Sequence, residues 1–374
     1  MSRENTSDRR PRLPGPDIVR GFAAIGIVLF HLCYLSGMKI DKTAFAIFNT
    51  FGSFVPLFFA ISGFFISYAY MERLNSRRDQ SLYYAKRFFR LAPLFYIMLA
   101  LEAGLTYALG GSAPSFHDVL LSLTFAFPFV PGKHESLVMA GWAVGIEWIF
   151  YVLAPALICL ITTKPRAIVA YLVALYLGMQ TGRLALHATP VLKSYYYMNI
   201  VNHLVFFMSG IVVFHFLRTI NNLRDSLETR VRSSVASGVL LAAVIVSLTL
   251  YHSLRLSPII DYHLAYSLAW IAVLVAAILG MPRLLNNAFT EFLGRSSYSI
   301  YLIHPVVIVC LKKATFYRHV EHAIHTPSIA LAIAALVTIG IVLIGAWISY
   351  RYVEEWVMNQ ALRILKAKLN TNSA

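Results

Sequence analysis

The sequence predicts an all-α, polytopic membrane helix bundle with about ten transmembrane helices and both termini in the cytoplasm. Of its 374 residues, 58% are hydrophobic and only 13% are charged, an apolar surplus larger than one aqueous core holds. Runs near 20 apolar residues are candidate spans. Ten are found, at about 18–37, 48–70, 90–109, 141–162, 166–182, 199–217, 234–251, 260–280, 292–311 and 328–349.

The basic residues give the orientation. With the N-terminus inside, 23 of the 32 lysine and arginine residues fall on the inner side, as the positive-inside rule requires. Membrane topology therefore explains the net charge of +15 without a nucleic-acid partner. We expect a multi-pass protein of the cytoplasmic membrane, with a cytoplasmic tail at 1–16, a membrane domain at 17–350 and a basic amphipathic cytoplasmic tail at 351–374. No cleavable signal peptide precedes the first span.

Cysteine usage predicts no metal site. The three cysteines, Cys33, Cys159 and Cys310, are far apart and lie in apolar runs without metal-ligand spacing. We assign them packing roles.

The first span carries unusual polar groups. In a helix, Arg20 and His31 lie about 20° apart around the axis and roughly 16 Å apart along it, so they share one face. Titratable groups in membrane helices are costly and usually face a protein interior or a water-filled path. Two simpler readings stay open: His31 as a packed neutral histidine, and Arg20 as a snorkelling anchor.

Several other titratable residues lie at a depth similar to that of His31. Counting residues from the membrane boundary places Glu147, His304 and His203 near the middle or in the outer half of the bilayer. A carboxylate beside an imidazole raises its basicity and fixes its tautomer, as a general base for a hydroxyl nucleophile requires. The alternative is packing of unrelated polar residues at one level.

The inner face is rich in arginine. Arg87 and Arg90 lie at i, i+3 on one helix face, with Arg20 and Arg295 at comparable depth. Arginine clusters suit phosphate through charge-assisted, bidentate hydrogen bonds, although ordinary inner-side anchoring is the alternative. Coenzyme A has the matching shape, with phosphates at one end and a long arm ending in a thioester. The rise from Arg20 to His31 is of the order such an arm spans.

Six segments, in order along the chain, point to one family. They are Arg20 with His31; 55–66, Val-Pro-Leu-Phe-Phe-Ala-Ile-Ser-Gly-Phe-Phe-Ile; Arg87-Phe-Phe-Arg90 followed by Pro93; 141–151, from Gly141-Trp142 to Glu147 and Tyr151; 293–305, ending in His304-Pro305; and 349–354. The chain resembles the membrane acyltransferase-3 family, the bacterial polysaccharide O-acyltransferases, over nearly its whole length.

The resemblance implies transfer of an acyl group, most often acetyl from acetyl-CoA, to a sugar hydroxyl of a surface or exported glycan. His31 and Arg20 match the family's essential pair, and Arg87 and Arg90 match its arginine pair. The sequence departs from the family at Pro56, where members often carry Asp, and it has no C-terminal hydrolase-like domain. The second departure implies a stand-alone enzyme.

Our mechanistic hypothesis is that His31, oriented by Glu147 or Asp17, deprotonates the acceptor hydroxyl, which attacks the thioester. The variant is a covalent acyl intermediate on His31, Ser299 or Tyr301. The candidate site residues are His31, Arg20, Glu147 and Asp17 for catalysis and Arg87, Arg90, Ser299, Tyr301 and His304 for donor binding.

Two other classes of function are compatible with parts of the sequence. A transporter or flippase also needs an intramembrane polar path, but no matching inverted halves are visible. A non-catalytic scaffold predicts that His31 and Arg20 tolerate replacement. As an enzyme, the protein is expected to use acyl-CoA, a glycan or lipid-linked saccharide acceptor, and membrane lipid as partners.

Two outer loops and the tail complete the prediction. Loops 111–139 and 183–198 are expected to set sugar specificity, with nearby aromatic residues either stacking on a glycan or forming an interfacial belt. The tail segment 351–369 is read as a basic interfacial helix on the inner leaflet, or as a solvated end that anchors the last span. Its apolar stripe consists of Val353, Trp356, Val357, Ala361, Ile364 and Leu365.

Overall fold

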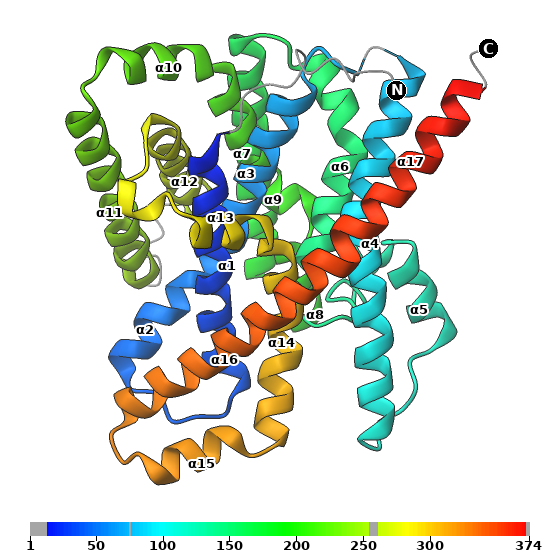
Figure 1. Cartoon of the computed structure of the whole chain (residues 1–374), viewed down its shortest axis with the longest axis vertical. Coiled ribbons are helices and arrows are strands. Elements are labelled where there is room, and N and C mark those ends of the chain that lie inside the picture. Colours follow the sequence, from blue (N-terminus) through cyan, green and yellow to red (C-terminus); the bar gives the residue numbers. More distant parts are fainter. Residues whose placement is uncertain (1–12, 75, 254–260, 372–374) are drawn as a thin grey trace.

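The computed structural model describes residues 13–74, 76–253 and 261–371, which form helices and connecting loops (Figure 1). The α-helices are α1 (Pro14–Leu35), α2 (Lys42–Thr50), α3 (Phe54–Tyr70), α4 (Arg77–Ala108), α5 (Phe116–Leu123), α6 (Trp142–Leu160), α7 (Lys164–Leu186), α8 (Pro190–Tyr197), α9 (Ile200–His215), α10 (Leu217–Ser226), α11 (Thr229–Ser253), α12 (Tyr262–Leu279), α13 (Ala288–Arg295), α14 (Ser297–Lys313), α15 (Phe316–Ala323), α16 (Pro327–Ser349) and α17 (Glu355–Thr371). Short 3₁₀ or π turns are η2 (Phe51–Ser53), η3 (Phe127–Phe129), η4 (Arg283–Leu285) and η5 (Tyr350–Glu354).

The predicted polytopic bundle is confirmed. Eight helices of the described chain are long and apolar enough to cross a membrane, or nine if α13 and α14, bent by 73°, form one span. A further expected span, 234–251, corresponds to α11, where some side chains lie outside the described residues. Residues 1–12 of the expected N-terminal tail also lie outside them. α1 begins and α17 ends toward the same end of the bundle (Figure 1).

Polar caps mark where several spans begin. The side chains of Ser76, Asn199 and Asp261 accept hydrogen bonds from backbone N–H groups in the first turns of α4, α9 and α12. Capping satisfies donors that have no partner within the helix, which is costly to leave undone near lipid. The outward faces are apolar, as on α7 and α16, where large aliphatic side chains are exposed.

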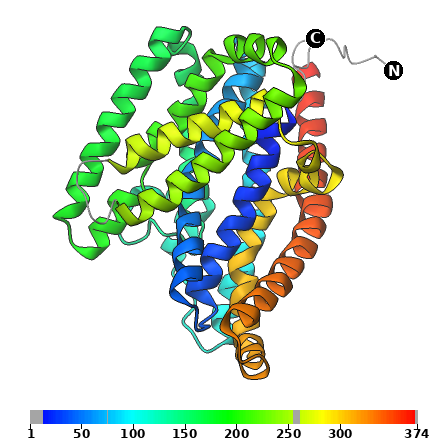
Figure 2. The same ribbon diagram turned by 90° about the vertical axis from the view of Figure 1, so that its left-hand side faces the viewer.

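Glycines bring α3 and α9 into backbone contact. A Cβ added at Gly63 would lie 2.1 Å from the carbonyl oxygen of Phe207, and one at Gly210 would lie 1.9 Å from that of Ala60. Small residues allow this close approach of membrane helices. The pair α3–α9 is thereby fixed beside α6, while α16 and α17 run as one column along the edge of the bundle (Figure 2).

Candidate functional site

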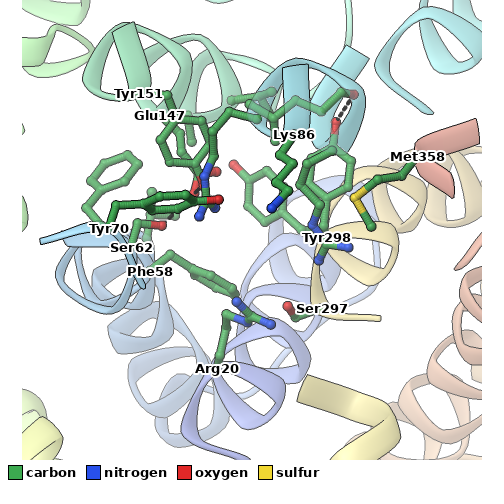
Figure 3. Close-up of a pocket in the computed structure, with 18 of the residues that line it drawn as sticks. Arg20, Phe58, Ser62, Tyr70, Lys86, Glu147, Tyr151, Ser297, Tyr298 and Met358 are labelled. Carbon is green, nitrogen blue, oxygen red and sulfur yellow. Dashed lines mark hydrogen bonds between the residues drawn. The ribbon is translucent and has the colours of Figure 1, made fainter. Parts of the chain in front are cut away.

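A polar cavity of about 330 Å³ lies between α1, α3, α4, α6, α14 and α17. Its size is typical of small-molecule sites. Arg20, Lys86 and Met358 approach it from different sides (Figure 3). The lining residues are Arg20, Val55, Phe58, Phe59, Ser62, Tyr70, Lys86, Arg87, Arg90, Leu91, Ala143, Val144, Glu147, Tyr151, Ser297, Tyr298, Tyr301, Met358 and Leu362.

The bend between α13 and α14 positions two of the cavity's arginines. Because α13 ends at Arg295, its last carbonyl groups have no partner within the helix. Arg20 donates from Nη2 to the Gly294 carbonyl at 2.8 Å, and Arg90 donates to the Arg295 carbonyl at 3.3 Å. A helix C-terminus also attracts cations through its dipole. Arg20 is further held by Asp17, at 3.2 Å.

Arg90 is neutralised by a buried carboxylate. Its Nη1 lies 2.6 Å from Oε2 of Glu354, a residue that is only 2% exposed. Ser299 donates to the other oxygen of Glu354 and lies 3.4 Å from Ser349 Oγ. The predicted donor-binding residue Ser299 is therefore fully buried behind the cavity wall, where it holds the partner of Arg90.

Arg87 and Lys86 have no carboxylate partner within the described chain. The Arg87 guanidinium lies over the rings of Tyr70, Tyr83 and Tyr151, at 5.2, 5.8 and 5.1 Å from their centroids. Tyrosine faces stabilise a cation, but its buried Nε has no hydrogen-bond partner there. This end of the cavity thus presents positive charge that a phosphate group can engage.

Glu147 is the acidic side chain in the lining. Its Oε1 accepts hydrogen bonds from Ser62, at 2.5 Å, and from the Tyr151 hydroxyl. Ser62 and Tyr151 were not among the predicted site residues, although both lie in the segments that carry the family resemblance. Their bonds orient Glu147 within the cavity wall.

Tyr301 separates the cavity from a pair of histidines. It lines the cavity, its hydroxyl donates to the Ala140 carbonyl at 2.8 Å, and its ring centroid lies 5.8 Å from that of His304. One turn further along α14, His304 Nε2 lies 3.0 Å from Nδ1 of His31. His31 therefore contacts His304, while Asp17 pairs with Arg20. The orienting partner proposed from depth alone, Glu147, bonds to other side chains.

The hydrogen bonds of this pair favour one set of tautomers. His304 Nδ1 lies 3.2 Å from the Ile300 carbonyl, and His31 Nδ1 lies 3.1 Å from the Ile27 carbonyl. Each carbonyl receives a donor only if both Nδ1 atoms carry hydrogen. His304 Nε2 then accepts from His31 Nδ1, and His31 Nε2 is the unprotonated nitrogen. Within the described residues, His31 Nε2 has no hydrogen-bond partner.

His203, the third histidine expected at this depth, packs elsewhere. Its ring lies against Phe59, Trp142 and Tyr197, with centroids 5.2 to 5.4 Å apart. Neither of its ring nitrogens has a hydrogen-bond partner in the described structure. Across the same described residues, no cluster of three His, Cys, Asp or Glu side chains is suited to a metal ion.

The two loops expected to contact the acceptor are joined to each other. His134 Nε2 lies 3.1 Å from Ser194 Oγ, and Ser194 donates to Glu135 at 2.9 Å. Burial lowers the pKa of His134, which therefore favours its neutral form. Lys133 bonds Asp118 at 2.8 Å and lowers the pKa of that carboxyl. The His134 and Ser194 contacts join the two loops, and the Lys133–Asp118 bond stabilises the first of them.

The long apolar helices are those of a multi-pass integral membrane protein. Its charged cavity and the adjacent imidazole pair form a polar site within the helix bundle. The chain belongs to the acyltransferase-3 family: the family's acyltransferase domain matches residues 13–350. No solved structure matches the chain significantly.

Curated relatives carry a related name. The O-acetyltransferase OatA of Staphylococcus aureus strain NCTC 8325 / PS 47 is 24% identical over 373 residues, covering 91% of this chain and 56% of that protein. OatA of strain COL gives the same values. The chain spans 56–58% of the length of the curated relatives it matches.

Proposed function

We propose that this protein is a membrane O-acyltransferase that moves an acyl group, in the first instance acetyl, from cytoplasmic acyl-CoA to a sugar hydroxyl of a cell-surface or exported glycan. One observation carries the proposal: the cavity lined by Lys86 and Arg87 is also lined by Tyr301, whose ring contacts His304 of the His31–His304 pair. The acyltransferase domain and the name of the OatA relatives support the same chemistry.

The basic end of the cavity fits the phosphates of the donor. Lys86 and Arg87 have no carboxylate partner in the described chain, and Arg20 lies across the cavity from Lys86 (Figure 3). Guanidinium groups bind phosphate through charge-assisted hydrogen bonds. The helical rise of roughly 16 Å from Arg20 to His31 leaves room for an extended thioester arm between the two ends.

At the other end, His31 acts as the general base. Its Nε2 takes the proton of the acceptor hydroxyl as the oxygen attacks the thioester carbonyl carbon. A C–O bond forms and the C–S bond breaks; the proton then passes from His31 to the departing thiolate. His304 keeps the proton on Nδ1 of His31, so that Nε2 is available as the base.

The test is transfer of radiolabelled acetyl from acetyl-CoA into saccharide by membranes carrying wild type, His31→Ala or no enzyme. We expect base-labile label, as an oxygen ester gives, only with wild type. His322→Ala is the matched control, because this histidine is exposed on α15. Full transfer by a correctly folded His31→Ala protein, or no transfer by wild type, would contradict the proposal.

A further inference from the structure

The last membrane helix does not end with the matched domain. α16 continues through the π turn η5 into α17, and the residues at both junctions keep right-handed helical angles. Single π turns inside α-helices frequently occur at functional sites. The acyltransferase domain match stops at residue 350, so the family match assigns no role to α17.

Glu354, at the end of the π turn, fixes α17 to the site. It is 2% exposed, pairs with Arg90 of α4 at 2.6 Å and accepts a hydrogen bond from Ser299 of α14. A buried carboxylate is stable only with such partners. The start of α17 is therefore attached to two helices that form the cavity.

One face of α17 completes the cavity wall. Met358 and Leu362 follow Glu354 at intervals of four residues, which places all three on one side of the helix. Both side chains line the cavity, and Figure 3 shows Met358 there. Trp356 and Ile364, on other faces, are 61% and 58% exposed. Of the predicted apolar stripe, Trp356 and Ile364 are thus exposed and Val353, Val357, Ala361 and Leu365 are half-buried; the stripe did not include Met358 or Leu362.

We propose that α17 is part of the donor site and that Met358 and Leu362 contact the nucleotide half of acyl-CoA. This inference rests on the function proposed above. Glu354 pairs with Arg90 of α4, and α17 runs from there toward the end of the bundle at which α4 begins (Figure 1). Met358 and Leu362 therefore lie beside the part of α4 that carries Lys86 and Arg87, which line the same cavity. A flexible thioether and an aliphatic side chain suit the apolar and aromatic groups beside the phosphates. α17 therefore selects the carrier and has no effect on the choice of acyl chain.

The first test compares two donors: acetyl-CoA and S-acetyl-N-acetylcysteamine, which has the thioester but no nucleotide. Met358→Ala is expected to raise the KM for acetyl-CoA roughly tenfold, equivalent to about 1.4 kcal/mol, and to change the rate with the short thioester by a much smaller factor. Met358→Leu should restore most of the affinity, and Ile364→Ala is the exposed control. Equal losses with both donors, or no loss with either, would overturn the proposal.

The second test does not depend on turnover. Met358→Cys is labelled with a water-soluble maleimide, with and without coenzyme A, and Trp356→Cys is the exposed control; mass spectrometry distinguishes each site from the natural cysteines. Coenzyme A should protect position 358 at least several-fold and leave position 356 unprotected. Protection without acetyl transfer by wild type would refute the proposed function and retain the donor site. Transfer without protection would refute the role of α17.

Discussion

Replacing His304 tests whether this residue positions His31, the proposed general base. His304→Ala removes the acceptor that lies 3.0 Å from His31 Nδ1 and leaves the Ile27 carbonyl as the partner of that nitrogen. A neutral hydrogen bond contributes about 0.5–1.5 kcal/mol, which corresponds to a loss of roughly 2- to 13-fold in kcat. The KM for acetyl-CoA should not change. His31→Ala removes the base itself and should cost roughly 10²- to 10⁴-fold.

The assay is the initial rate of acetyl transfer by purified protein at saturating acetyl-CoA. His304→Gln is the informative companion variant, because its amide oxygen can accept the same hydrogen bond, and its rate should exceed that of His304→Ala. A rate for His304→Ala equal to wild type would refute the positioning role. A loss as large as that of His31→Ala, with no recovery in His304→Gln, would show that His304 takes part in the chemistry directly.

The remaining predictions concern the donor end and the packing of the bundle. Arg87→Ala should raise the KM for acetyl-CoA roughly 10- to 100-fold, since a charge-assisted hydrogen bond contributes about 1.5–3 kcal/mol, while Arg87→Lys should recover part of it. Glu354→Gln should lower thermal stability, because breaking a buried pair costs about 3–5 kcal/mol. The double variant with Arg90→Gln should lose less stability than the sum of the losses of the two single variants. Gly63→Ala should destabilise the protein, because its Cβ would lie 2.1 Å from a carbonyl oxygen of α9. Gly340→Ala, where a Cβ meets no described atom within 4 Å, should not.

Each of these has a clear contradicting result. An unchanged KM in Arg87→Ala would remove this residue from the donor site. Strict additivity in the Glu354 and Arg90 double-mutant cycle would show that the pair is not coupled. Equal melting temperatures for the two glycine variants in detergent, measured at matched protein concentration, would show that α3 and α9 separate at little cost.

The membrane bundle could be predicted because hydropathy reports directly on the length and position of a span. The bend at Arg295 could not be predicted in this way. Hydropathy predicted residues 292–311 as one span, but the break is stabilised by distant groups, Arg20 and Arg90, which donate to the carbonyls that it exposes. Such contacts have no signature in the local sequence.

The candidate site could be predicted from the sequence only in part. Residue counting gives the height of a side chain in the membrane, but it does not give the direction in which the side chain points. Depth therefore gave Glu147 as a candidate orienting partner of His31 and placed His304 only at a similar level. The packing of α1 against α14 brings His304 into contact with His31. The tail showed the same limit: its amphipathic pattern predicted a helix, but not that Met358 would face the cavity.

The backbone contact between α3 and α9 has a consequence for motion. Ser62, which holds Glu147, directly precedes Gly63, whose Cα lies against the backbone of α9. Because the backbones of α3 and α9 are in contact, the two helices cannot slide or separate without losing that packing. We therefore expect the α3 side of the cavity to be rigid. Substrate entry and product exit are then expected to occur without separation of α3 from α9.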